Sequence, residues 1–387
     1  MTQKKKPVLR FKGFTDDWEQ RKIFELFKIT RGHVLASPLI SDTKTGDKPY
    51  PVFSSQTKNN GLMGYYKDYL YQDAITWTTD GANAGTVNYR AEKFYCTNVC
   101  GVLLADKVIP NQMIAEALNK VAKRHVSYVG NPKLMNNVMA DIEITLPDDE
   151  NEQKRISYLF DKIDNLITLH QRKYEKLRNL KKFFLEKIFP QNGKRVPEVR
   201  FAGFTGNWEQ RKLGELAEFN PKASLPDSFE YVDLESVVGT RIINHRTEKK
   251  DSAPSRAQRL AQPGDVFYQT VRPYQRNNCL FTGAEKSYVF STGYAQLRSH
   301  GDSYFLLTML QKDDFVNSVM DRCTGTSYPA INSNELAEIN VIFPTIIQEQ
   351  KELGQFFKNI DNLITLHQRK LEKLQNLKKA ALDKMFV

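Results

Sequence analysis

The segment IDNLITLHQRK occupies residues 163–173 and returns without a change at residues 360–370. When both copies are extended to residues 163–182 and 360–379, they are identical at 18 of 20 positions. Self-similarity at a fixed offset is the signature of a duplicated architecture, and it takes precedence over any local prediction. The chain is therefore a tandem duplication, and these segments belong to the part that both halves retain.

A second pair of near-identical segments opens the two halves. Residues 10–22 read RFKGFTDDWEQRK and residues 200–212 read RFAGFTGNWEQRK, with ten of 13 positions identical. Between the conserved motifs, residues 30–130 and 220–325 have lost almost all resemblance. Loops normally diverge within a domain and not over such a length, so the pattern indicates two different targets met on one shared frame.

The conserved C-terminal segment of each half has the spacing of a coiled coil. Its apolar seam alternates intervals of four and three, from Ile156 to Ile188 and from Leu353 to Met385,. We expect two long helices, each about 60 Å at ~1.5 Å per residue. The order domain, helix, domain, helix favours an antiparallel pair with pseudo-two-fold symmetry. The side chains expected at the helix interface are Ile163, Ile167, His170, Leu177, Ile360, Ile364, His367, Leu371 and Leu374.

Two features of these helices have more than one interpretation. His170 and His367 lie on the seam, where one polar residue usually sets register, so we do not expect a metal ligand or a pH switch. The exposed face is basic in both copies, which fits either a solvated helix surface or a docking surface for an acidic partner or a DNA backbone. The cations are Arg172, Lys173, Lys176, Arg178, Lys181, Lys182, Arg369, Lys370, Lys373, Lys378 and Lys379.

The divergent middles, residues 30–145 and 220–342, alternate short β-branched and aromatic runs with turn signals, and each predicts a mixed α/β globule,. Intervening helices are expected over residues 112–124 and 303–320. The polar loops carry side chains that read base edges and phosphates. The candidate DNA-binding residues are Ser55, Gln56, Lys58, Asn59, Asn60, Trp77, Thr79, Asn83, Gln269, Arg272, Tyr274, Gln275, Arg276, Asn277, Arg322, Thr326 and Tyr328.

Composition and motifs exclude several other classes of protein. A formal net charge of +11 makes an anionic partner plausible, and no apolar run approaches the ~18 to 20 residues of a membrane span,. Four scattered cysteines without a CxxC pair predict neither a disulfide framework nor a zinc site,. There is no phosphate-binding GxxxxGK[ST] loop and no methyltransferase tetrapeptide, and a loose nuclease-like pattern at Asp227 and Glu248 has no counterpart in the other half,. We therefore expect no catalytic residue and no metal site, and a cytoplasmic location.

The paired GFTDDWEQRK and GFTGNWEQRK motifs, with Glu152-Gln153-Lys154 and Glu349-Gln350-Lys351 at the start of each helix, resemble the DNA specificity subunit of type I restriction-modification systems. The resemblance implies an α+β fold in which two target recognition domains each read one half of a split, asymmetric DNA site. It also implies paired spacer helices that fix the gap between the halves.

The resemblance further implies a division of the chain and a set of partners. We expect recognition domains at residues 1–149 and 191–346, with spacer helices at 150–190 and 347–387. The implied partners are double-stranded DNA, two methyltransferase subunits and restriction subunits, and no membrane. No cofactor is expected in this chain, since S-adenosylmethionine, ATP and Mg²⁺ would be bound by partner subunits. The alternatives are a coiled-coil DNA-binding scaffold or regulator outside any restriction-modification complex, and a fused nuclease or methyltransferase.

Overall fold

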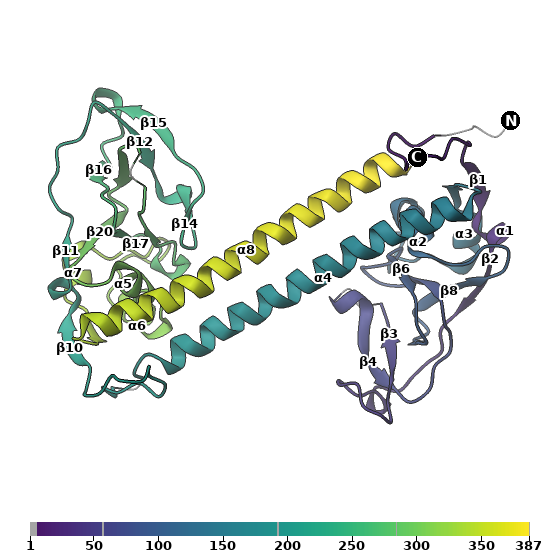
Figure 1. Ribbon diagram of the computed structural model, residues 1–387, viewed down its shortest axis with the longest axis horizontal. Coiled ribbons are helices and arrows are strands. Elements are labelled where there is room, and N and C mark those ends of the chain that lie inside the picture. Colours follow the sequence, from purple (N-terminus) through teal and green to yellow (C-terminus); the bar gives the residue numbers. More distant parts are fainter. Residues whose placement is uncertain (1–5, 56–57, 192, 284, 387) are drawn as a thin grey trace. The chain divides into compact units, whose positions relative to one another are not determined.

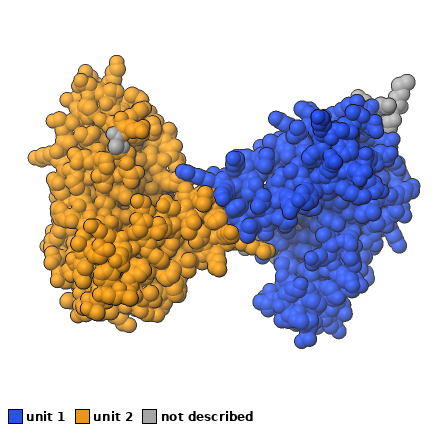
Figure 2. All heavy atoms as spheres, viewed as in Figure 1, with its two compact units in different colours: residues 1–171, 369–387 blue, residues 172–368 orange. Residues whose placement is uncertain are grey.

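The computed structural model of the protein describes residues 6–55, 58–191, 193–283 and 285–386. The chain forms two compact units (Figure 2): unit 1 contains Met1–Gln171 and Arg369–Val387, and unit 2 contains Arg172–Gln368. Each unit therefore combines the globular part of one repeat with the end of the other repeat's long helix. The sequence predicts four segments, and the structure divides the chain into these two units. The four-segment division remains a prediction.

Both long helices form as expected and are uninterrupted (Figure 1). They are α4, Glu150–Lys187, and α8, Ile347–Met385. At the start of α4 the Asp149 carboxylate accepts a hydrogen bond from the backbone N–H of Asn151 at 2.7 Å, which satisfies a free donor of the first turn,. Every seam residue from Ile156 to Ile188 and from Leu353 to Met385 is buried or half-buried. His170 and His367 are half-buried on this seam, and neither is without a partner.

Within each unit the two helix segments run antiparallel. In unit 1 the carboxylate of Asp164 lies 2.7 Å from the Lys378 ammonium, and in unit 2 that of Asp361 lies 2.6 Å from Lys181. The repeat relates Asp164 to Asp361 and Lys181 to Lys378, so the same ion pair forms twice with the two repeats exchanged. Further along unit 1 the rings of Phe160 and Phe386 are 5.6 Å apart, which continues the antiparallel register. The heptad analysis is confirmed in both units.

The globular part of unit 1 is built on a four-stranded antiparallel sheet in the order β2-β8-β5-β6. Along β5, Ile75 and Trp77 face a core with helix α2, while Ala74 faces a second core against the three-stranded sheet β4-β3-β7. A further pair, β1-β9, joins the two ends of the domain. The elements are β1 (Glu19–Lys22), α1 (Ile23–Leu26), β2 (Phe27–Arg31), β3 (Tyr50–Phe53), β4 (Leu62–Tyr66), β5 (Ala74–Thr78), β6 (Val87–Arg90), β7 (Tyr95–Cys96), β8 (Cys100–Ala105), α2 (Gln112–Ala122), α3 (Asn136–Asp141) and β9 (Glu143–Leu146).

Unit 2 repeats the main sheet of unit 1 in a different sequence, whereas its second sheet has four strands, β15-β12-β19-β16, in place of three. Its sheet β11-β20-β17-β18 corresponds to β2-β8-β5-β6, and its parallel pair β12 and β19 corresponds to β3 and β7. The elements are β10 (Glu209–Lys212), β11 (Ala217–Phe219), β12 (Ser228–Val232), β13 (Val237–Val238), β14 (Arg241–Ile242), β15 (Arg246–Lys249), β16 (Ala257–Leu260), β17 (Asp265–Gln269), β18 (Cys279–Leu280), β19 (Tyr288–Ser291), β20 (Tyr294–Ser299), α5 (Ser303–Met309), α6 (Asp313–Met320), α7 (Ser333–Ala337) and β21 (Asn340–Phe343). The shared frame inferred from the repeat is confirmed.

One helix prediction was wrong in detail. Residues 303–320 form two helices, α5 and α6, separated by Leu310–Lys312. The second helix begins with Asp313 and Asp314, which stabilise a new helix N-terminus by their charge,. The break places Lys312 with its ammonium 5.0 Å above the Phe189 ring.

The near-identity of the conserved motifs has a structural cause. Arg10 donates two hydrogen bonds to the buried Glu152 carboxylate, at 2.6 and 2.7 Å, and Arg200 does the same to Glu349 at 2.7 and 2.8 Å. A buried carboxylate without such a partner would be strongly destabilising. Each opening motif is thus tied to the first turn of the long helix of its own repeat.

A phenylalanine just beyond each long helix packs into the core of the unit built on the other repeat. Phe386 packs on Trp18 in the core of unit 1, with ring centroids 6.2 Å apart. Phe189, its equivalent in the first repeat, packs on Trp208 in the core of unit 2 at 5.8 Å. Neither core is closed by its own repeat alone.

Candidate nucleic-acid interface

In unit 2 two loops are tied together at one end of the sheet. The β17–β18 connection contains the 3-10 turn η7 (Pro273–Gln275), and the backbone N–H of Arg272 donates to the Pro329 carbonyl at 2.7 Å. Ile331 N–H donates in turn to the Thr270 carbonyl at 3.0 Å. The second loop, residues 324–330, is closed by a backbone bridge between its ends. The predicted residues of the β17–β18 connection and those of residues 324–330 are therefore brought side by side.

Unit 1 has the same arrangement. The β5–β6 connection is tied to residues 127–133, because Gly81 N–H donates to the Pro132 carbonyl and Leu134 N–H to the Thr79 carbonyl, both at 2.9 Å. Loop 127–133 was missed as a candidate site, although Tyr128 is 71% and Val129 93% exposed. One signal was available in the sequence: Pro132 and Pro329 differ by 197 residues, the offset of the long helices.

Two arginines of the β17–β18 loop adopt the left-handed backbone conformation. Arg272 has φ of 55° and Arg276 has φ of 56°. Such conformations are costly for residues other than glycine and concentrate at functional sites. The Arg272 guanidinium lies 4.3 Å from the centre of the Tyr328 ring, and Arg276 pairs with Asp313 at 2.7 Å. Arg272 is thus presented as a flat, preorganised donor beside an exposed aromatic ring.

Several other predicted residues of unit 2 lie around this loop. Tyr274, Gln275, Thr326 and Tyr328 are exposed. Asn277 is half-buried, and its side-chain oxygen accepts a hydrogen bond from Gly239 N–H at 2.9 Å. Exposed Arg322 precedes the second loop and lies 3.9 Å from Glu335.

Three predicted DNA contacts lie inside the domains, which contradicts a direct contact in this structure. Trp77 is 1% exposed and its indole N–H donates to the Leu134 carbonyl at 3.0 Å. Buried Thr79 hydrogen-bonds Asp80 at 2.7 Å. Buried Gln269 donates from its side-chain nitrogen to the Val271 carbonyl at 2.7 Å. Their side chains support the loops from inside the domains, because buried polar groups form their hydrogen bonds within the protein.

In unit 1 the 3-10 turn η2 (Lys58–Gly61) contacts Arg90, which is half-buried. Asn59 and Asn60 are exposed with φ of 50° and 54°, which asparagine tolerates better than most residues,. The Arg90 guanidinium donates to the Asn60 carbonyl at 2.7 Å and lies 3.6 Å from the Phe53 ring. Burial lowers the pKa of Arg90 to about 10.

The remaining predicted residues of unit 1 are placed near this turn. The side chain of Asn83 donates to the carbonyl of half-buried Ser55 at 3.2 Å, which links the β5–β6 connection to the segment before η2. Gln56 lies outside the described residues, and the structure locates Lys58 by its backbone alone.

Within the described part of the chain, no group of three or more His, Cys, Asp or Glu side chains is placed to hold a metal ion. Burial raises the pKa of the Cys100 thiol to about 11, so this group is a poor nucleophile,. None of the described helices is both long and apolar enough to span a membrane.

Two domains that share a main sheet present different loops from the same end of that frame. The chain matches the type I restriction modification DNA specificity domain over residues 15–179 and again over 205–376. It therefore belongs to that family, and its role as a sequence-specific recognition subunit follows from this membership.

Individual relatives agree with this assignment. The chain is 40% identical over 137 residues to a protein of Mycoplasma pneumoniae named as the N-terminus of a type I specificity subunit, covering 34% of this chain and 71% of the relative. It is 21% identical to the specificity subunit of the type I restriction enzyme MjaVIII of Methanocaldococcus jannaschii, covering 95% and 92%. The solved S subunit of a type I restriction-modification system from M. genitalium has the same fold, with a TM-score of 0.71 at 16% identity over 99% of both chains.

Proposed function

We propose that this chain recognises a bipartite, asymmetric DNA site and that each unit reads one half of it. One observation carries the proposal: the same pair of loops is tied together in both units, by matching backbone hydrogen bonds, but with different side chains. Hydrogen bonds from side chains to base edges distinguish one DNA sequence from another. Two different half-sites therefore require the same loop scaffold with different side chains at the contact positions.

The chain acts in this proposal as a guide for other subunits. Two methyltransferase subunits bring S-adenosylmethionine and modify adenine, and restriction subunits bring ATP-dependent translocation and cleavage with Mg²⁺. The chain itself holds no cofactor and catalyses nothing, and the complex works in the cytoplasm on double-stranded DNA. A scaffold or regulator outside a restriction-modification complex is not favoured, because the family match covers both repeats.

An exchange of domains within the chain tests the division of labour. Residues 27–146, from β2 to β9, are replaced by residues 217–343, from β11 to β21, and the variant is expressed with its methyltransferase subunits. The recognised site should become symmetrical, with the half read by unit 2 present twice. Mapping of methylated adenines across a genome reads the result, and the reciprocal replacement should duplicate the other half. Methylation of the original asymmetric site by either variant would contradict separate reading.

A further inference from the structure

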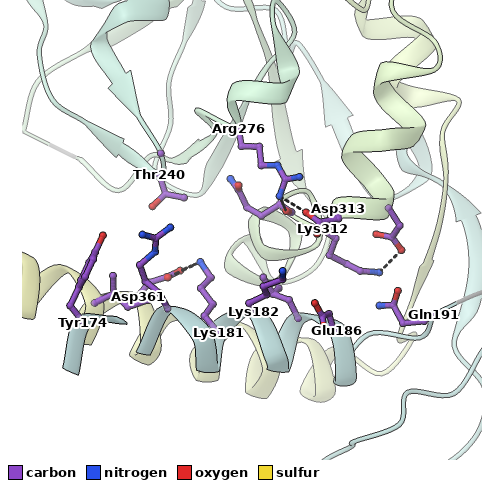
Figure 3. Close-up of a pocket in the computed structure, with 16 residues that line it drawn as sticks. Tyr174, Lys181, Lys182, Glu186, Gln191, Thr240, Arg276, Lys312, Asp313 and Asp361 are labelled. Atoms are coloured by element: carbon purple, nitrogen blue, oxygen red, sulfur yellow. Dashed lines mark hydrogen bonds and ion pairs between the residues drawn. The ribbon is translucent and has the colours of Figure 1, made fainter. Parts of the chain in front are cut away.

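Unit 2 contains a cavity of about 530 Å³ between α4 and the loops of the recognition domain (Figure 3). Tyr174, Lys181 and Lys182 line it from the helix, while Thr240 and Arg276 lie on the opposite side. Thr240 belongs to the turn between β13 and β14, and Arg276 belongs to the β17–β18 connection, the loop that also carries Arg272. The cavity therefore adjoins the surface proposed to read DNA.

The two copies of the long helix differ in this cavity. Of the 20 aligned positions from Ile163 to Lys182, two differ between the repeats: Tyr174 corresponds to Leu371, and Arg178 to Gln375. Both Tyr174 and Arg178 line the cavity, and the Arg178 guanidinium lies 5.6 Å from the Tyr174 ring centre. The helix sequence thus departs from its repeat where α4 faces the loops of unit 2.

The cations that line the cavity differ in their pairing and exposure. Lys181 is paired with Asp361, Arg276 with Asp313, and Lys312 with Asp314, at 2.6, 2.7 and 2.9 Å. Arg178 and Lys182 also line the cavity, and both are exposed. One further carboxylate lines the cavity, that of Glu186, and it lies toward Gln191, away from Tyr174.

We propose that Arg178 and Lys182 bind backbone phosphates of the DNA half-site held by unit 2. The proposal rests on the function proposed above and adds a contact made by the helix of the first repeat to the half-site of the second. The occupant is duplex DNA, because the cations adjoin the loop that offers Arg272 to base edges, and phosphates flank every base. Arginine suits this role since its planar fork can donate two hydrogen bonds to one phosphate.

The repeat supplies its own matched variants. Arg178→Gln installs the residue that the second repeat carries, Gln375→Arg makes the reverse change on α8, and Arg178→Lys keeps the charge. Each is assembled with its methyltransferase subunits, and binding to a duplex carrying the methylated site is measured over a range of salt concentrations. Arg178→Gln should weaken binding roughly three- to tenfold at low salt and reduce the salt slope by about 0.9, with the same site still recognised. Arg178→Lys should retain most of the slope.

A second measurement locates the phosphate. Uncharged methylphosphonate linkages are placed one at a time beside the half-site read by unit 2. One of them should weaken the wild-type complex and leave the Arg178→Gln complex unchanged, while linkages beside the other half-site should affect both alike. Inorganic phosphate should compete no better than chloride at equal ionic strength; stronger competition would indicate a free-anion site and overturn the DNA contact.

The outcomes separate this inference from the proposed function. If the wild-type complex binds its site and Arg178→Gln shows the wild-type slope and methylphosphonate response, the phosphate contact is refuted while site recognition stands. If the wild-type complex shows no preference for any sequence, the proposed function itself fails.

Discussion

Replacement of Phe386 by alanine tests the exchange of helix ends between repeats. Phe386 is 5% exposed and contacts the rings of Trp18 and Phe160 in the core of unit 1. Truncation of a buried phenylalanine costs about 3–5 kcal/mol, and we expect the lower value because a final helical turn can shift to fill part of the space. For a unit of this size, ~3 kcal/mol corresponds to a fall in Tm of roughly 6–12 °C.

Calorimetry and hydrogen exchange together measure this effect. Calorimetry gives the fall in Tm, and hydrogen exchange should show faster exchange in β1 and β9 of unit 1 than in β10 and β21 of unit 2. Leu377→Ala is the control, because Leu377 lies on the same helix and is 53% exposed. Phe189→Ala should produce the converse pattern. If Phe386→Ala destabilises no more than Leu377→Ala, the core of unit 1 does not depend on the other repeat.

Three further predictions concern the loops and one buried carboxyl. Arg272→Ala should relax one position of the recognised site at roughly 1–3 kcal/mol, as read by methylome mapping; equal weakening at all sites would assign the residue to a phosphate. Trp77→Phe removes the hydrogen bond to the Leu134 carbonyl and should lower the free energy of unfolding by about 1–2 kcal/mol without changing the recognised sequence,; a changed sequence would restore Trp77 as a contact. Burial raises the pKa of Glu116, so its contribution to the free energy of unfolding should fall as pH rises from its ordinary pKa of 4.5 toward its raised folded pKa,. Denaturation of Glu116→Gln at several pH values should show a flatter profile in that window, and an unchanged slope would exclude this carboxyl as the cause.

The helices and the duplicated frame were predictable because their signals are periodic or repeated. The heptad seam from Ile156 to Ile188 depends on spacing along one helix, and the structure confirms it. The break at Leu310–Lys312 was not predictable in the same way, since no glycine or proline marks it.

The candidate site was harder to predict because it is assembled by tertiary contacts. Trp77 and Gln269 look like contact residues in a polar sequence, yet the sheet buries both. The association of residues 127–133 with the β5–β6 connection depends on backbone hydrogen bonds between segments about fifty residues apart in sequence, which no local pattern encodes,. Comparison of the two repeats at the Pro132 and Pro329 positions was the one available clue.

The exchange of helix ends also determines the order in which the two units can complete their folding during synthesis. Unit 1 is closed by Ala381, Met385 and Phe386, so its core stays open until the ribosome has added more than two hundred residues beyond Gln171. At a synthesis rate of about 5–20 residues per second, the wait is on the order of 10–40 s. During that interval Trp18 and Phe160 lack their final cover and present an apolar surface to chaperones. Unit 2, whose residues are contiguous, has no such delay.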